Sequence, residues 1–257
     1  MIARFDASTV IVTGAAHGFG RAIALAFVER GATVWACDVI ADSLAETTRL
    51  GAGRDGALHT RLVDITDREA VMAFASEAES ASASGAVDVL VNNAGGVGGQ
   101  VGRPMEEITT EAWRALFAIN VDAAFTFSQA VVPGMKRIGS GRIVSISSGA
   151  GLGVSLTGIQ AYASAKAAQI GLTRQLAHEL GRYGITVNNV APGFVRSNPT
   201  TERQWMSYGE AGQAALLERI ALRRLGTPDD IANAVVFFAS PFAGWVTGQV
   251  LSVDGGK

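Results

Sequence analysis

Short apolar stretches alternate with longer amphipathic stretches along this 257-residue chain. Several of the short stretches lack polar alternation, as expected of strands that are buried on both faces. The longer stretches have the pattern of helices. The predicted strands cover residues 9–12, 33–37, 57–63, 87–91, 142–146, 186–190 and 250–253, and the predicted helices cover residues 21–30, 41–49, 67–82, 110–136, 161–182 and 228–239.

This alternation predicts an α/β fold, with a single Rossmann-like, doubly wound domain over residues 1–257. Right-handed strand–helix–strand units place seven parallel strands in one sheet and helices on both of its faces. Segment 194–224 departs from the pattern, because it is polar, contains Trp205 and Tyr208 and follows the carboxyl end of a strand. Such excursions are usually lids or binding loops, so we expect a substrate-binding loop here. A helical subunit contact is the alternative.

The composition narrows the class of partner. Hydrophobic residues make up 48% of the chain and charged residues 17%, which suits a large core and shows no signature of disorder. The net charge is −2 and there is no basic tract, so neither nucleic acid nor an anionic membrane is an expected partner. No apolar run reaches about 18 residues, and the amino terminus lacks the order of a signal peptide. The single Cys37 excludes an internal disulfide framework. We expect a cytoplasmic protein.

A glycine-rich turn follows the first predicted strand. Gly14, Gly18 and Gly20 stand there before a helix predicted to open at Arg21. Glycines let a backbone turn sharply and approach a pyrophosphate, and a helix amino terminus supplies N–H donors and a positive dipole end. The spacing differs from the Gly-x-Gly-x-x-Gly fingerprint. A purely structural turn is the alternative.

Asp38 ends the second predicted strand, eighteen residues after Gly20. An acidic side chain at this place hydrogen-bonds the adenosine ribose hydroxyls and repels a 2′-phosphate. Val39 follows, so the next position holds no arginine for that phosphate, and His17 is the only nearby candidate. The sequence therefore predicts NAD(H) in preference to NADP(H). Asp38 as the cap of the next helix is the alternative, and it does not exclude the first role.

Tyr162 and Lys166 stand four residues apart on a predicted helix, with Ser148 upstream. Residues at this spacing share one helix face. The reference pKa of tyrosine is about 10, too high for a general base at neutral pH. A nearby positive charge favours the phenolate, so the pair forms a plausible proton-transfer device. By itself the pair is weak evidence for this function, because the same spacing occurs by chance on many surface helices.

Together these motifs resemble the short-chain dehydrogenase/reductase family, in its short single-domain branch. The matching elements are in family order and span essentially the whole chain: Thr-Gly-x-x-x-Gly-x-Gly at 13–20, Asn-Asn-Ala-Gly at 92–95, Asn120, Ser148, Tyr-x-x-x-Lys at 162–166, Pro-Gly at 192–193 and Asp-Gly-Gly at 254–256. Three departures are small. Phe19 replaces an aliphatic residue, Ser197 replaces a threonine, and the interval from Ser148 to Tyr162 is one residue longer than is common, which leaves Ser147 as a minor rival.

The resemblance assigns roles to these residues. It makes Tyr162 the general acid/base on the substrate oxygen and Ser148 the group that binds and orients that oxygen. Lys166 would hold the nicotinamide ribose and lower the pKa of Tyr162, and Asn120 would position a water that relays protons from Lys166. Alternative roles are a helix cap for Asp64 and a strand brace for Asn93. The expected cofactor contacts are Gly14, His17, Gly18, Phe19, Gly20, Asp38, Asp64, Ile65, Asn93, Ala94, Gly95, Tyr162, Lys166, Pro192, Gly193, Val195 and Ser197.

The predicted function is therefore an NAD(H)-dependent dehydrogenase or ketone reductase that acts on a small molecule at a secondary alcohol. Polar residues of segment 194–224 favour a sugar or polyol. Reduction of a 3-oxoacyl thioester is the alternative, and a non-catalytic NAD(H)-binding regulator is a minor one. No cluster of His, Cys and Glu suggests a metal. The resemblance also implies a homo-oligomer, most often a tetramer.

Overall fold

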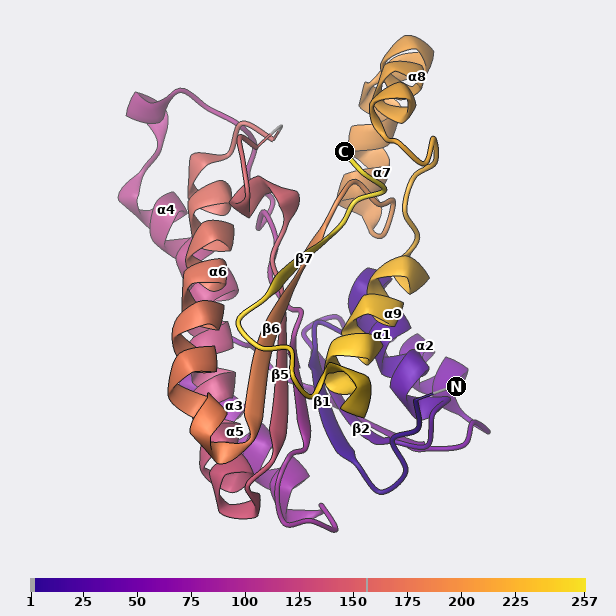
Figure 1. The fold of residues 1–257 in the computed structure, drawn as a ribbon. Helices are drawn as coiled ribbons and strands as arrows, with labels where there is room; N and C mark the ends of the chain where they lie inside the picture. Colours follow the sequence, from indigo (N-terminus) through magenta and orange to yellow (C-terminus); the bar gives the residue numbers. More distant parts are fainter. Residues whose placement is uncertain (1–2, 156) are drawn as a thin grey trace.

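The protein is described by a computed structural model that covers residues 3–155 and 157–257 (Figure 1). Met1 and Ile2 lie outside the described residues, and so does the start of the amino-terminal stretch that was expected to lack a signal peptide. The sheet is parallel, with strand order β3-β2-β1-β4-β5-β6-β7. Every strand end falls within two residues of its prediction: β1 (Thr9–Thr13), β2 (Thr33–Asp38), β3 (Ala57–Leu62), β4 (Val89–Asn92), β5 (Gly141–Ile146), β6 (Ile185–Pro192) and β7 (Val250–Val253). The predicted seven-stranded Rossmann-like sheet is confirmed.

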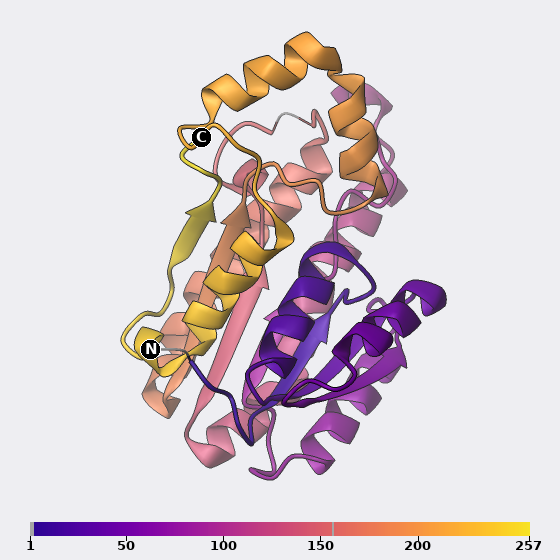
Figure 2. The ribbon, with the colours of Figure 1, turned by 90° about the vertical axis from the view of Figure 1, so that its right-hand side faces the viewer.

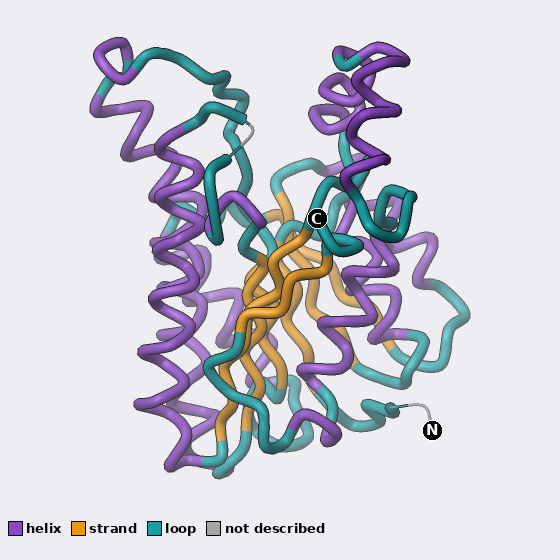
Figure 3. The backbone as a smooth tube through the Cα atoms, turned by 45° about the horizontal axis from the view of Figure 1, so that its top comes forward, coloured by secondary structure: helices purple, strands orange, loops and turns teal. Residues whose placement is uncertain are grey.

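Helices cover both faces of the sheet (Figures 1 and 3). Adjacent strand residues explain this, because Val10 and Val12 lie in one apolar core cluster and Ile11 lies in the other. Such alternation is the period of two expected of a strand, with apolar side chains on each side. One layer holds α1 (Gly18–Val28), α2 (Ala41–Gly51) and α9 (Pro228–Ala239), and the other holds α3 (Arg68–Ser80), α5 (Ala123–Ile138) and α6 (Gln160–Leu180).

The helix predicted over residues 110–136 is not uninterrupted, which corrects the prediction. It comprises α4 (Thr110–Phe117), a π turn at Ala118–Asp122 and α5. The Ala123 N–H donates to the Ala118 carbonyl, which is the wider π spacing. Asn120 therefore lies at a distortion of the helix, where functional residues often occur.

The run Thr110–Ile138 is also long and apolar enough to cross a membrane, contrary to the expectation that no segment would be. A core helix of an α/β protein meets the same criteria. Phe127, Val131 and Met135 of α5 are buried in the core cluster that α5 shares with the sheet. Packing against the sheet thus accounts for its apolar side.

Segment 194–224, predicted as a loop, contains two helices, α7 (Pro199–Ser207) and α8 (Gly209–Arg219). They lie beyond the carboxyl ends of the strands (Figures 1 and 2). The sequence held the signal, since Asn198 and Thr201 form a capping box and Pro199 occupies the first helical turn. A parallel sheet binds ligands at this edge, so both helices stand where a substrate would enter.

Candidate active site

The glycine turn after β1 forms a cradle that requires glycine at three places. Gly14 and Gly18 have φ of +71° and +55°, in the left-handed region. A Cβ on Gly20 would stand 2.0 Å from the Gly14 carbonyl oxygen, so no side chain fits there. Helix α1 begins at Gly18 rather than at Arg21, and its N-cap residue His17 makes no side-chain cap bond. The first N–H groups of α1 beside a close-approaching backbone fit a dinucleotide pyrophosphate.

Asp38 fixes one side of this cradle. Its Oδ2 accepts from the Ala16 N–H at 2.9 Å, and its Oδ1 accepts from the Val39 and Ile40 N–H groups at 2.7 and 3.2 Å. The alternative role as a helix cap is wrong, because the N-cap of α2 is Ile40. The carboxylate instead ties the end of β2 to the glycine turn, at the place where the resemblance expects a ribose.

Asn93 braces the cradle from the other side, as the alternative role for it predicted. Its Nδ2 donates to the Thr13 and Gly14 carbonyls at 2.8 and 3.1 Å. The Thr13 hydroxyl in turn accepts from the Asn93 and Ala94 N–H groups at 3.0 and 2.9 Å. A Cβ on Gly14 would stand 2.8 Å from the Ala94 Cα. Close backbone approach therefore brings residues 93–95 against the cradle.

The Asn120 side chain holds the loop that follows β4, and its part in a water relay stays a prediction. It is fully buried, its Nδ2 donates to the Gly96 and Leu116 carbonyls, and its Oδ1 accepts from the Gly96 N–H, each at 2.9 Å. A Cβ on Gly95 would stand 2.5 Å from that Oδ1. Both amide hydrogens are engaged on the loop after β4 and on α4, and a relay at this residue would need the main chain.

Asp64 and Ile65 follow β3. Hydrogen bonds from the Thr66 hydroxyl and N–H, at 2.7 and 2.8 Å, lower the pKa of Asp64. The alternative role of Asp64 as a helix cap is wrong, since Asp67 caps α3. Ile65 packs against the core, whereas Asp64 is exposed. The Asp64 carboxylate thus reaches the surface beside the end of β2.

The residues after β6 close the far side of the cradle. Pro192 is buried at the end of that strand, and a Cβ on Gly193 would stand 2.7 Å from the Asp254 Cα. Val195 is buried and bridges to Gly226. A Cβ on Gly18 would stand 2.5 Å from the Ser197 carbonyl oxygen. The turn that opens α1 and the turn that leads into α7 are therefore in contact.

Of the two candidate serines, Ser148 lies beside Tyr162, whereas Ser147 is engaged inside the sheet. The Ser147 hydroxyl is buried and donates to Asn189 Oδ1 inside the sheet. The Ser148 Oγ accepts from the Ala150 N–H at 3.1 Å, which leaves its own proton for another acceptor. Burial raises the pKa of Tyr162, and the Ser148 hydroxyl acts in the opposite direction. Ser148 and Tyr162 therefore share one site.

Lys166 lies one helical turn after Tyr162 and is almost fully buried. Its Nζ donates to the Ile146 carbonyl at 2.9 Å and to Gln169 Oε1 at 3.0 Å, and lies 5.8 Å from the centroid of the Tyr162 ring. Burial lowers the pKa of Lys166 to about 7. The protein thus holds a phenol of raised pKa beside an amine of lowered pKa, and the amine favours the phenolate only in its charged form.

The sequence did not point to two residues that hold this region together. The Arg21 guanidinium braces the cradle by donating to the Ala16 and Ser43 carbonyls and to the Thr47 hydroxyl. Gln169 contacts Lys166. Only the position of Gln169 gave a signal, since a residue three places after Lys166 shares its helix face.

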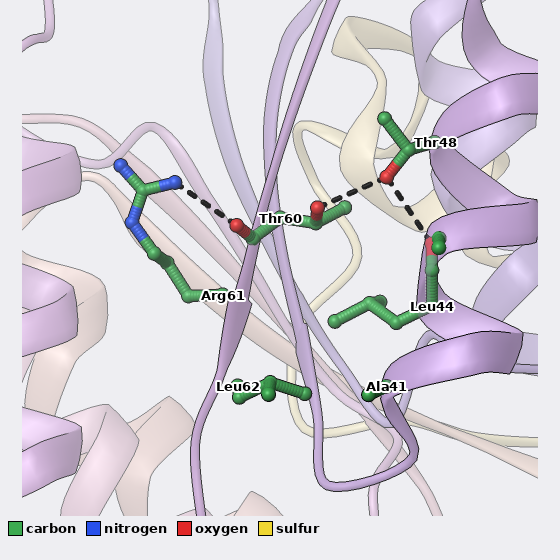
Figure 4. Close-up of a pocket in the computed structure, with 7 residues that line it drawn as sticks. Ala41, Leu44, Thr48, Thr60, Arg61 and Leu62 are labelled. Carbon is green, nitrogen blue, oxygen red and sulfur yellow. Dashed lines mark hydrogen bonds between the residues drawn. The ribbon is translucent and has the colours of Figure 1, made fainter.

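A hollow between α2 and β3 lies apart from the catalytic side chains (Figure 4). Its polar groups are paired with one another, as in the 3.0 Å contact between the Thr48 and Thr60 hydroxyls and the bond from Arg61 to the Thr60 carbonyl. Apolar Ala41, Leu44 and Leu62 complete the lining. Nothing in this hollow joins it to the chemistry of Tyr162.

Comparisons with known proteins agree with this geometry. The family model described as enoyl-(acyl carrier protein) reductase matches residues 14–257. The 3-oxoacyl-[acyl-carrier-protein] reductase FabG of Thermotoga maritima is 36% identical, over 98% of each chain. The 7alpha-hydroxysteroid dehydrogenase of Escherichia coli is 38% identical, over 98% of this chain and 95% of that one. The probable galactose dehydrogenase GalD of Rhizobium meliloti is 39% identical, over 96% and 93%.

Solved structures show the same relationship. A short-chain type dehydrogenase/reductase from Mycobacterium ulcerans superposes with a TM-score of 0.90 at 28% identity, over 98% of this chain and 90% of that one. A 7α-hydroxysteroid dehydrogenase complexed with NADH and 7-oxoglycochenodeoxycholic acid superposes with a TM-score of 0.86 at 36% identity, over 98% and 95%. The sequence matches and the fold thus both extend over nearly the whole chain, and the protein belongs to the short-chain dehydrogenase/reductase family.

Proposed function

We propose that this protein is an NAD(H)-dependent oxidoreductase that interconverts a secondary alcohol and a ketone. The observation that carries the proposal is the placement of Ser148, Tyr162 and Lys166 at the sheet edge that also holds the glycine cradle. A bound nicotinamide would supply or accept the hydride. The side chains of this protein would manage the proton and orient the substrate.

Proton transfer falls to Tyr162. In oxidation its oxygen takes the hydroxyl proton of the substrate, and in reduction it returns a proton to the carbonyl oxygen. The Ser148 hydroxyl already accepts from the Ala150 N–H, so it donates its proton to the same substrate oxygen. Lys166 lies on the Tyr162 side of α6 and favours the phenolate when it is charged.

The preference for NAD(H) rests on Asp38. Its carboxylate is fixed by three backbone N–H groups at the edge of the cradle. A second negative group placed there, such as a 2′-phosphate, would be repelled. The side chains that follow it, Val39 and Ile40, are apolar and exposed, and offer no compensating charge.

The substrate proposed here is less polar than a sugar. The polar residues that favoured a sugar pair within their own segment: Arg196 with Glu202, Asn198 with the first turn of α7, Gln204 with Tyr208. The segments that follow the carboxyl ends of β4, β5 and β6 expose large apolar side chains instead. These are Val101, Met105, Leu152, Val154 and Met206. They support a ketone or alcohol on an apolar ring, with α7 and α8 as the part that closes over it.

Steady-state rates with a panel of substrates test the proposal: alicyclic and steroid alcohols, sugars, polyols and 3-oxoacyl thioesters, each with both cofactors. We expect turnover of an apolar cyclic alcohol with NAD⁺. Preference for a 3-oxoacyl thioester with NADPH would overturn both the substrate class and the role of Asp38. Tight NADH binding without turnover of any compound would favour the regulator alternative. The homotetramer and the cytoplasmic location remain predictions.

A further inference from the structure

Gln169 is a buried polar residue, only 2% exposed, that the proposed mechanism does not use. It follows Lys166 by three positions on α6, and its Oε1 accepts from Lys166 Nζ at 3.0 Å. A lysine ammonium has donors and no acceptor. The orientation of the Gln169 amide is therefore fixed, with its oxygen toward Lys166 and its nitrogen away.

That orientation leaves the other end of the amide unsatisfied. Gln169 Nε2 is buried and has no hydrogen-bond partner among residues 3–155 and 157–257. A buried amide nitrogen without a partner is destabilising, and an apolar side chain of similar size would avoid the penalty. Stability alone therefore does not account for glutamine at this position. The hydrogen bond to Lys166 explains why a glutamine stands at this position.

The position of the Lys166 amine is set by two acceptors. The Ile146 carbonyl and Gln169 Oε1 take two of its three hydrogen-bond directions, at 2.9 and 3.0 Å. We propose that Gln169 is a positioning residue, which together with the Ile146 carbonyl holds the Lys166 amine beside Tyr162 in its charged form and directs its third N–H toward the bound cofactor. This inference rests on the proposed function.

The surroundings of Lys166 contain little else that stabilises its charge. Tyr162 is the titratable group that faces it on α6, and the contact of the amine from β5 is the neutral Ile146 carbonyl. Gly151 of η3 (Gly149–Gly151) lies against the Lys166 main chain and brings no charge. Burial already lowers the pKa of Lys166 to about 7. Loss of the Gln169 oxygen would lower that pKa further, because a hydrogen bond to the charged form would be lost.

The decisive variant is Gln169→Met, which keeps the size of the side chain and removes the acceptor. We expect kcat/KM for alcohol oxidation to fall by roughly tenfold or more, the loss of a hydrogen bond to a charged group. The acidic limb of its pH profile should move to higher pH, since less charge on Lys166 favours the phenolate less. The midpoint of thermal unfolding should stay level or rise, because the unpaired Nε2 is gone.

Thr173→Val is the matched control. Thr173 is buried one turn further along α6, and its hydroxyl donates to the Gln169 main-chain carbonyl at 2.9 Å and accepts from Asn189 at 3.3 Å. This substitution also removes a buried polar group, but one without contact to Lys166 in the hydrogen bonds of the described chain. We expect a lower unfolding midpoint and an unchanged pH limb.

The NADH dissociation constant, measured by fluorescence without substrate, separates this inference from the proposed function. We expect Gln169→Met to weaken NADH binding roughly three- to tenfold and Thr173→Val to leave it unchanged. That result would support the positioning role even for a protein that turned over none of the panel. Wild-type NADH affinity and an unmoved pH limb in Gln169→Met would overturn it, as would equal effects in both variants.

Discussion

The two halves of the site are stabilised in opposite ways. The glycine cradle of residues 14–20 is held by fixed backbone contacts, with Asp38 and Asn93 satisfied by N–H and carbonyl groups of the turn. The catalytic half buries Tyr162 and Lys166 in surroundings that disfavour their charged forms. Substitutions in the cradle should therefore cost stability and cofactor binding together. Substitutions in the catalytic half should cost turnover and spare stability, as is common at active sites.

The largest expected effect is that of Tyr162→Phe. Turnover should fall by roughly 10²–10⁴-fold or more, because the substrate oxygen loses its acid/base group. NADH binding and the unfolding midpoint should stay close to wild type. Tyr183→Phe is the control, since Tyr183 packs against Lys136 and Arg182 away from the site. Substantial turnover by Tyr162→Phe would refute the assignment of the proton to this residue.

Gly20→Ala should break the cradle. Its added Cβ would stand 2.0 Å from the Gly14 oxygen and 2.6 Å from Asn93 Nδ2, so the turn must open. We expect NADH binding to weaken by roughly 100-fold, the loss of about 3 kcal/mol typical of a strained or overpacked position. The unfolding midpoint should fall as well.

Gly171→Ala is the control for that variant. Gly171 lies in α6, and apart from its chain neighbours and the adjacent backbone of that helix, no described atom is within 4 Å of where its Cβ would stand. Alanine is the better helix former, so its midpoint should hold or rise. Wild-type NADH affinity in Gly20→Ala would show that the cradle tolerates opening. It would contradict the claim that substitutions in the cradle cost stability and cofactor binding together.

Asp38→Asn sharpens the comparison within the cradle. The amide oxygen can still accept the N–H groups on one side of the turn, but the amide NH2 cannot accept those on the other, so some stability is lost. The charge that would repel a 2′-phosphate is gone. The ratio of kcat/KM with NADP⁺ to that with NAD⁺ should rise about tenfold, a difference near 1.4 kcal/mol. Steady-state rates with both cofactors measure it, and Asp42→Asn in the first turn of α2 is the control. An unchanged ratio would mean that Asp38 supports the turn and does not select the cofactor.

The smallest expected effect, and the sharpest test of the contrast, is the pH dependence of stability in Lys166→Met. Burial lowers the pKa of Lys166 from 10.5 to about 7. Between these values the unfolded chain binds more protons, so the wild type loses stability as pH falls from 10.5 to about 7 and changes no further below it. The variant lacks this loss. Its midpoint should therefore exceed that of the wild type most at pH 7 and by less at pH 10, and the expected result is the direction of this change with pH.

Calorimetry at pH 7, 8.5 and 10 measures this difference. Lys136→Met is the control, because it makes the same substitution at a partly exposed lysine beside Glu179 and removes no buried amine. A lower midpoint for Lys166→Met than for the wild type at pH 7 would show that the buried amine stabilises the fold.

Local signals were sufficient for most of the fold. The strand ends follow from apolar runs with turn residues between them, and the glycine positions follow from a turn that needs positive φ at Gly14 and Gly18. Two errors had different causes. The helix predicted over 110–136 hides a π turn at Asn120, for which periodicity gives no sign. The helices of segment 194–224 were foreseen only in the alternative of a helical subunit contact, although the capping box at Asn198 predicts one of them.

The sequence by itself determined which segments form strands, the glycines of the cradle and the pairing of Tyr162 with Lys166 on one helix face, because each depends on spacing within a few residues or on an unbroken apolar run. Only the tertiary structure decided which partner each polar side chain meets. The Ser147 hydroxyl donates to Asn189, which is 42 residues away, and the Asn120 amide donates to the Gly96 carbonyl in the loop after β4. The position of the Lys166 amine is fixed by the Ile146 carbonyl at the end of β5 and by Gln169 on the same helix. Such contacts arise when distant elements pack, and packing also sets the burial that shifts the pKa values of Tyr162 and Lys166.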